Sequence, residues 1–100
     1  MRLEFVDSAT IEFEEAVAWY AAHELKVAHD FRAAVNRLID RLLEHPLSAP
    51  LFFLEYRAVV LGKYPYRLVY RVTGDALVVV ALRHISRDPE DLKSGLVERP

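Results

Sequence analysis

The spacing of the apolar residues changes near residue 50, and this change limits the folds that the chain can adopt. Before it, apolar side chains recur at helical spacing in two stripes: Ala9, Phe13, Ala16, Val17 and Tyr20, and then Val27, Phe31, Ala34, Val35, Leu38 and Leu42. After it, residues 51–85 are rich in β-branched and aromatic side chains, and Gly62-Lys63 and Gly74-Asp75 interrupt them. The pattern predicts two helices followed by a sheet.

Capping and breaking residues mark the ends of the helical half. Residues 3–5 alternate apolar and charged side chains, which is typical of a short strand. Asp7 and Ser8 follow this strand and are favoured N-cap residues, so the first helix is expected to begin there. The second helix is expected to end near His45, because Pro46 cannot continue it.

The second half is predicted to form a three-stranded antiparallel meander, followed by a short C-terminal helix. Asp88 is expected to cap that helix, with Pro89 at its first position and Gly95 as its stop. The predicted fold is α+β, in the order βααβββ, with two antiparallel helices packed on one face of a small, mainly antiparallel sheet. Residues 1–100 are expected to form a single domain, since 53% hydrophobic residues suffice for one core.

Several classes of protein are excluded by composition. The chain has no cysteine, which rules out disulfides, thiol chemistry and cysteine-based zinc sites, and its four histidines are not clustered. We therefore expect no metal and no cofactor. No apolar run approaches the roughly 20 residues needed to cross a bilayer, and the N-terminus lacks the layout of a signal peptide. A cytoplasmic location without a membrane partner is the resulting expectation.

Charge is distributed unevenly along the chain. Residues 1–55 hold five basic and ten acidic side chains. Residues 56–87 hold Asp75 as their only acid and six basic side chains, Arg57, Lys63, Arg67, Arg71, Arg83 and Arg87, a net of +5 in a chain whose net charge is -2. This segment is interpreted in two ways, as solvated strand residues or as a site for an anionic partner.

A two-residue turn at Gly74-Asp75 would determine which of these basic groups share a face. It would pair Arg71 with Val78 and Arg67 with Leu82, opposite each other across the two strands. Side chains alternate between faces, so Arg67, Arg71 and His84 would then lie together. The other face would be the better core and would carry the helices, with Arg83 at its edge; it would consist of Tyr66, Leu68, Tyr70, Val72, Leu77, Val79, Ala81 and Arg83.

A face with these groups suits phosphate chemistry. Arginine presents a planar fork of donors to phosphate oxygens, and a histidine can move a proton near neutral pH. RNA cleavage requires both, because the 2′-hydroxyl must be deprotonated and the charge on the pentacovalent phosphate must be stabilised. Structural roles for His84, and exposed or protein-binding roles for Arg67 and Arg71, are the alternatives.

Three segments resemble the RelE/ParE superfamily of bacterial toxins from type II toxin–antitoxin systems, also called the plasmid stabilisation type. The first helix, "FVDSATIEFEEAVAWY", and the second, "FRAAVNRLIDRLLEHPLSAP", are similar to the helices of that superfamily. The sheet segment, "YRAVVLGKYPYRLVYRVTGDALVVVALRHISRDP", is the most specific part. The resemblance implies a growth-inhibiting toxin that an antitoxin neutralises in a hetero-oligomeric complex.

By position, the resemblance also implies roles for individual residues. Arg67, His84 and Arg87 match catalytic positions of the RNA-cleaving members, while Arg57 and Lys63 match positions for further basic groups, to which the hairpin pairing adds Arg71 as a candidate phosphate-binding residue. RelE-like members cut messenger RNA on the ribosome, whereas ParE-like members poison DNA gyrase without an RNase site. Here the C-terminal segment "PEDLKSG" lacks the tyrosine of the RelE pattern, which weakens the nuclease assignment.

Three functions follow from the resemblance. The ParE-like toxin acting on gyrase is favoured, because the acidic first half offers no large basic surface for a ribosome. The alternatives are a ribosome-dependent mRNA endoribonuclease and a non-toxic binding domain of the same fold. In each case Trp19, beside the first helical stripe, is expected to lie under the antitoxin.

Overall fold

The computed structural model describes residues 1–98 and contains three helices and five strands in that part of the chain. In order they are β1 (Arg2–Phe5), α1 (Asp7–His23), α2 (Leu25–Glu44), β2 (Leu51–Phe53), β3 (Tyr56–Val60), β4 (Tyr66–Thr73), β5 (Ala76–His84) and α3 (Pro89–Glu98). The strand order in the sheet is β1-β5-β4-β3-β2. Only β1 runs parallel to its neighbour, and the other described pairs are antiparallel, which confirms the predicted α+β class.

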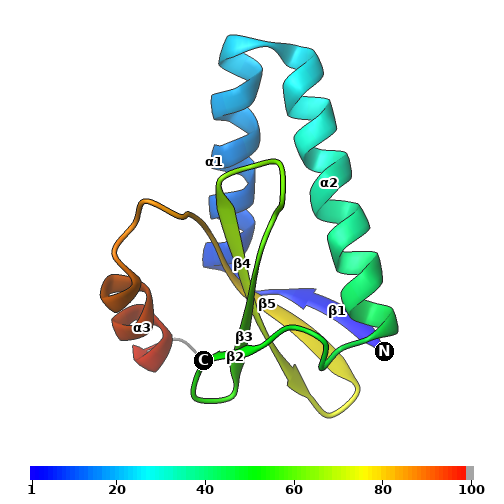
Figure 1. Cartoon of the computed structure of the whole chain (residues 1–100), viewed down its shortest axis with the longest axis vertical. Coiled ribbons are helices and arrows are strands. Elements are labelled where there is room, and N and C mark those ends of the chain that lie inside the picture. Colours follow the sequence, from blue (N-terminus) through cyan, green and yellow to red (C-terminus); the bar gives the residue numbers. More distant parts are fainter. Residues whose placement is uncertain (99–100) are drawn as a thin grey trace.

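The α1–α2 hairpin covers one face of the sheet, as predicted (Figure 1). Both apolar stripes point inward: Ala9 and Ala16 of α1 and Phe31 of α2 are buried among strand residues. The strand side of this core includes Leu68, Tyr70, Leu77, Val79 and Leu82. None of the helices in residues 1–98 has the length and apolar character required to span a membrane.

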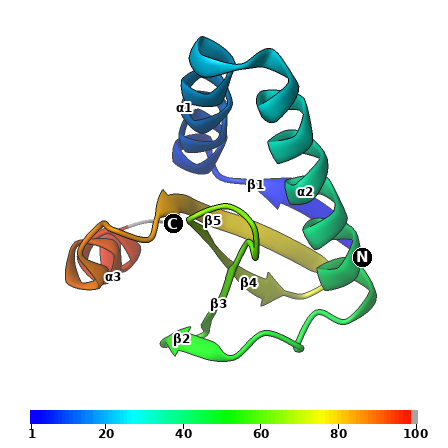
Figure 2. The same cartoon turned by 45° about the horizontal axis from the view of Figure 1, so that its top comes forward.

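The short C-terminal helix α3 covers the opposite face, across β5 from the helical hairpin (Figure 2). Leu92 and Leu96 are both 2% exposed and pack on Val69, Val78 and Val80. The Asp88 carboxylate accepts the backbone N–H of Glu90 at 2.9 Å, which confirms the predicted cap. The predicted stop at Gly95 is wrong, because the helix continues through it and thereby buries Leu96.

The first helix begins at Asp7, as predicted, but its predicted capping residues and one strand prediction are wrong. Val6 is the N-cap residue, and not Asp7 or Ser8. The Val6 N–H is bonded to the Val79 carbonyl at 3.0 Å, so the chain passes directly from the sheet into the helix, and Asp7 lies in the first turn. The predicted first strand of the meander is two strands, β2 and β3, because Leu54 adopts a left-handed φ of 51° and reverses the chain.

The register between β4 and β5 changes part-way along the pair. From the turn, where Gly74 has a φ of 58°, the predicted pairing is confirmed as far as Tyr70, which lies opposite Val79. Val69 then lies opposite Ala81, so Val80 is an extra residue in β5, a β-bulge. Beyond the bulge the pairing is offset by one residue, and every predicted partner there is wrong.

Candidate functional site

Arg67 lies on the α3 side of the sheet. It is paired with Arg83 and not with Leu82, because of the bulge at Val80. Its guanidinium carbon lies 5.4 Å from the centre of the Phe52 ring, and the ammonium nitrogen of Lys93 in α3 lies 5.5 Å from the same ring. Two cations therefore share one aromatic side chain, in a half-buried position beneath α3.

His84 lies on the helical-hairpin side, so the predicted face of Arg67, Arg71 and His84 does not form. His84 is paired with Tyr66, and their ring centres are 5.4 Å apart. The backbone N–H of Ser86 donates to Nδ1 of His84 at 3.1 Å, and the Ser86 hydroxyl lies 2.8 Å from the same atom. Because Nδ1 accepts, the neutral ring carries its proton on Nε2.

An aromatic pocket opens beside His84. Its volume is about 400 Å³, and it is lined by Trp19, Tyr20, Pro65, Tyr66, His84 and Ser86. Trp19 is 57% exposed although its ring is large and apolar. Burial raises the pKa of the Tyr66 hydroxyl and of the Tyr20 hydroxyl, and the neighbouring tyrosines raise the pKa of Tyr20 further. At neutral pH the pocket wall is therefore uncharged at both phenols.

Glu12 of α1 fixes the end of β5 next to this pocket. β1 pairs with β5 only as far as Val79, so beyond that point none of the strands in residues 1–98 pairs with β5 on this side. One carboxylate oxygen of Glu12 accepts the backbone N–H of Leu82 at 3.1 Å, and the other accepts from Nε of Arg83 at 2.8 Å. The side chain thus takes the place of a pairing strand. No periodicity in the sequence indicates this role, since it depends on where α1 meets β5.

The remaining predicted residues lie in separate places. Arg87 lines a cleft of about 350 Å³ with His84 and Trp19. Two of the predicted catalytic residues, His84 and Arg87, therefore share one cleft. Arg57 donates to the carbonyls of Leu47 and Ala49 at 3.2 and 2.7 Å, and so holds the loop after α2.

Arg71 pairs with Val78, on the α3 side, and bonds to the Thr73 hydroxyl at 3.2 Å. Lys63 lies in the turn between β3 and β4, beside Tyr64 and away from the other predicted residues. Within residues 1–98, no three histidine, aspartate or glutamate side chains gather as metal ligands would.

The sequence model described as "ParE toxin of type II toxin-antitoxin system, parDE" matches residues 3–89. The chain belongs to the ParE toxin family. This ParE-family chain is therefore a toxin of a type II toxin–antitoxin system, and the recognised RelE/ParE resemblance is confirmed. Among curated proteins, no sequence matches it.

Solved structures share the fold of this ParE-family chain. The chromosomal ParDE toxin–antitoxin system from P. aeruginosa has a chain with a TM-score of 0.71 and 15% identity, covering 84% of this chain and 95% of that one. A YoeB/ParE toxin from Agrobacterium tumefaciens gives a TM-score of 0.60 and 22% identity, covering 84% and 98%. The isolated E. coli RelE toxin gives 0.58 and 20%, covering 98% and 96%. At these identities the likeness concerns the fold alone.

Proposed function

We propose that this ParE-family toxin inhibits growth by acting on DNA gyrase and does not cleave RNA. The observation that carries the proposal is the separation of Arg67 from His84 by the sheet. Arg67 packs on Phe52 on the α3 side, whereas His84 packs on Tyr66 on the hairpin side.

RNA cleavage requires a phosphate-holding cation and an acid–base group within reach of the same phosphodiester. Here the bulge at Val80 directs these two side chains away from each other. The α3 helix also supplies Lys93 and two leucines to the Arg67 side, and its described residues include no tyrosine. This geometry supports a binding toxin over a nuclease with Arg67 and His84 in one site.

We also propose that the antitoxin docks at the pocket beside Trp19 and forms a hetero-oligomer with the toxin. A tryptophan that is 57% exposed over a pocket of about 400 Å³ is the kind of aromatic surface that a partner covers. The walls of the pocket are mostly apolar rings, so an apolar side chain of the antitoxin fits it better than a charged one.

One specific observation favours the nuclease as a second candidate, since His84 and Arg87 line a single open cleft. A nuclease built there would use Arg87 in place of Arg67 to hold phosphate. Substitutions distinguish the gyrase toxin from this nuclease. Arg67→Ala should leave growth arrest unchanged in either case. His84→Gln should abolish growth arrest only if the toxin is the nuclease, because it should then lower the rate of RNA cleavage by about 10² or more.

The target itself is tested by inducing the toxin and following DNA and RNA together. We expect DNA breaks to accumulate that depend on gyrase, while ribosome-bound transcripts remain intact and a cell-free extract continues to translate. Cuts within codons of ribosome-bound transcripts, at doses that arrest growth, would replace the gyrase proposal with the nuclease.

A further inference from the structure

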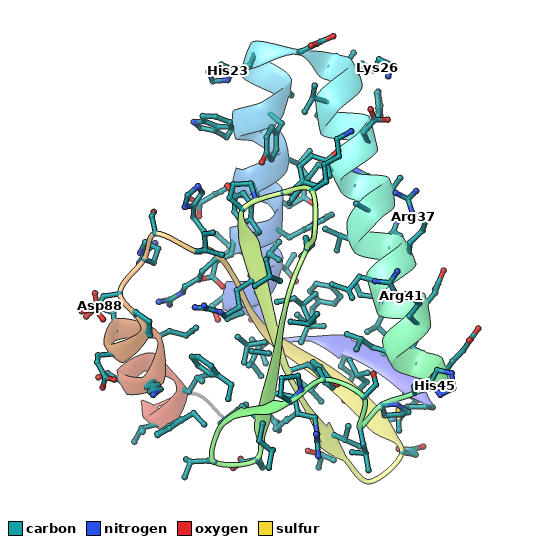
Figure 3. All side chains as sticks on the ribbon, viewed as in Figure 1. His23, Lys26, Arg37, Arg41, His45 and Asp88 are labelled. Carbon is teal, nitrogen blue, oxygen red and sulfur yellow. The ribbon has the colours of Figure 1, made fainter. Side chains whose placement is uncertain are left out.

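A second cleft, of about 300 Å³, lies between α2 and the turn that joins β3 to β4. Arg37 and Arg41 line it from α2, where Figure 3 labels them, and Lys63 lines it from the turn. The two arginines are four residues apart, so they occupy the same side of the helix one turn from each other. Three cations from two separate elements therefore surround one opening.

The shape of this cleft follows from small side chains. Ala33 and Ala34 stand where longer residues would fill the space between α2 and the turn. Leu38, Leu61 and Tyr64 complete the lining, and each of them is less than 8% exposed. The floor therefore belongs to the rigid core, and the basic side chains extend from it.

These cations are not neutralised by the protein itself. Within residues 1–98, no ion pair joins Arg37, Arg41 or Lys63 to a carboxylate. Asp30 is the one acidic side chain among the lining residues, and its carboxylate lies 3.4 Å from the ammonium of Lys26. Like charges held near one another repel, so an anion in the cleft relieves an electrostatic cost that the free protein carries.

We propose that this cleft binds phosphate groups, from either a free polyphosphate or a phosphodiester backbone. Two arginine forks and an ammonium match the several charges and many acceptor oxygens of phosphate, whereas a lone carboxylate would leave most of the positive charge uncompensated. The cleft is also larger than one phosphate needs, so it admits two linked groups. This site is separate from the aromatic pocket and does not depend on the gyrase proposal.

The test is a titration of the full chain, labelled with ¹⁵N, with inorganic pyrophosphate and with a short single-stranded DNA. Chemical shifts should move in residues of α2 and the β3–β4 turn. The double variant Arg37→Gln/Arg41→Gln should bind pyrophosphate more weakly than the native chain. Each lost charge-assisted contact should raise the dissociation constant by up to about tenfold. Arg32→Gln is the control for one lost charge, because it removes a single positive charge from the same helix outside the cleft, and it should bind as the native chain does. The single variants Arg37→Gln and Arg41→Gln, which remove the same amount of charge, are compared with it.

The two ligands identify the source of the phosphate. Binding of pyrophosphate alone supports a free polyphosphate, and tighter binding of the DNA supports a phosphodiester backbone. The proposal is overturned if neither ligand shifts the cleft residues, if the double variant binds as tightly as the control, or if an oligoglutamate peptide binds as tightly as pyrophosphate. The last result would assign the cleft to an acidic protein segment.

Discussion

Replacing Glu12 is expected to destabilise the toxin far more than its position on an otherwise acidic helix suggests. Glu12→Ala removes the acceptor of the Leu82 N–H, and Leu82 is only 2% exposed. An unsatisfied buried donor costs about 1–3 kcal/mol. The same change leaves Arg83 without its partner at 2.8 Å, in a pair whose side chains are 14% and 20% exposed. Together the two losses should lower the free energy of unfolding by about 2–4 kcal/mol.

A second substitution separates the two contributions. Glu12→Gln retains an oxygen that can accept from Leu82 and removes only the charge opposite Arg83, so it should cost about 1–2 kcal/mol. Glu15→Ala is the control, since Glu15 is an exposed acid of the same helix and should change stability by less than about 0.5 kcal/mol. Urea unfolding monitored by circular dichroism measures all three.

The reasoning is refuted by two results. One is a Glu12→Ala cost that is no larger than that of Glu15→Ala, which would mean that water replaces the carboxylate at the edge of β5. The other is an equal cost for Glu12→Gln and Glu12→Ala, which would assign the whole effect to charge. A double-mutant cycle with Arg83→Met then measures the coupling of that pair directly.

Three further predictions concern the pocket, the pH range and the loop after α2. Trp19→Ala should weaken antitoxin binding by about 2 kcal/mol, roughly 30-fold. Ile11→Ala changes another exposed apolar residue of α1 and should leave antitoxin binding unchanged. Calorimetric titration compares the two variants, and equal losses of affinity would contradict the docking site. Because the pKa values of Tyr20 and Tyr66 are raised in the folded protein, the unfolded chain loses these protons first, and stability should fall as the pH rises above 10.0. Alkaline unfolding of the native chain and of Tyr66→Phe measures this loss of stability. The same pH dependence in both proteins would contradict the prediction. Arg57→Ala should cost about 1–3 kcal/mol by releasing the carbonyls of two loop residues, and thermal unfolding at an unchanged temperature would refute this clamp.

The helices and the cap of α3 could be predicted because their signals are local. The stripes through Phe13 and Phe31 repeat at helical spacing, and Asp88 before a proline is a favoured cap. Leu54 gave no such signal: leucine rarely adopts a positive φ, so the turn between β2 and β3 had no glycine or asparagine to mark it. The sequence gives no signal for the bulge at Val80 either, because Val80 is one apolar residue in an apolar strand.

Packing between elements that are distant in the sequence explains the rest of the difference between prediction and structure. The resemblance implies that Lys63 joins Arg57 as a further basic group of an RNA-binding site, yet Lys63 lines a cleft with the two arginines of α2. Those arginines lie in the half of the chain where acidic residues outnumber basic ones, so the net charge of that segment does not indicate a basic site. Only the packing of α2 against the β3–β4 turn brings the three cations together.

The bulge at Val80 makes strand register a determinant of chemistry in this fold. If Val80 paired with Val69, the regular pairing from the Gly74 turn would continue through β5, and Arg67 would then share a face with His84. A change of register alone, with every residue retained, therefore brings together or separates a basic group and a proton carrier. When this chain is aligned without a gap to a relative whose strands pair regularly at this position, the residues beyond Val80 are matched with residues from the opposite surface, so motifs on either side of it should be compared separately.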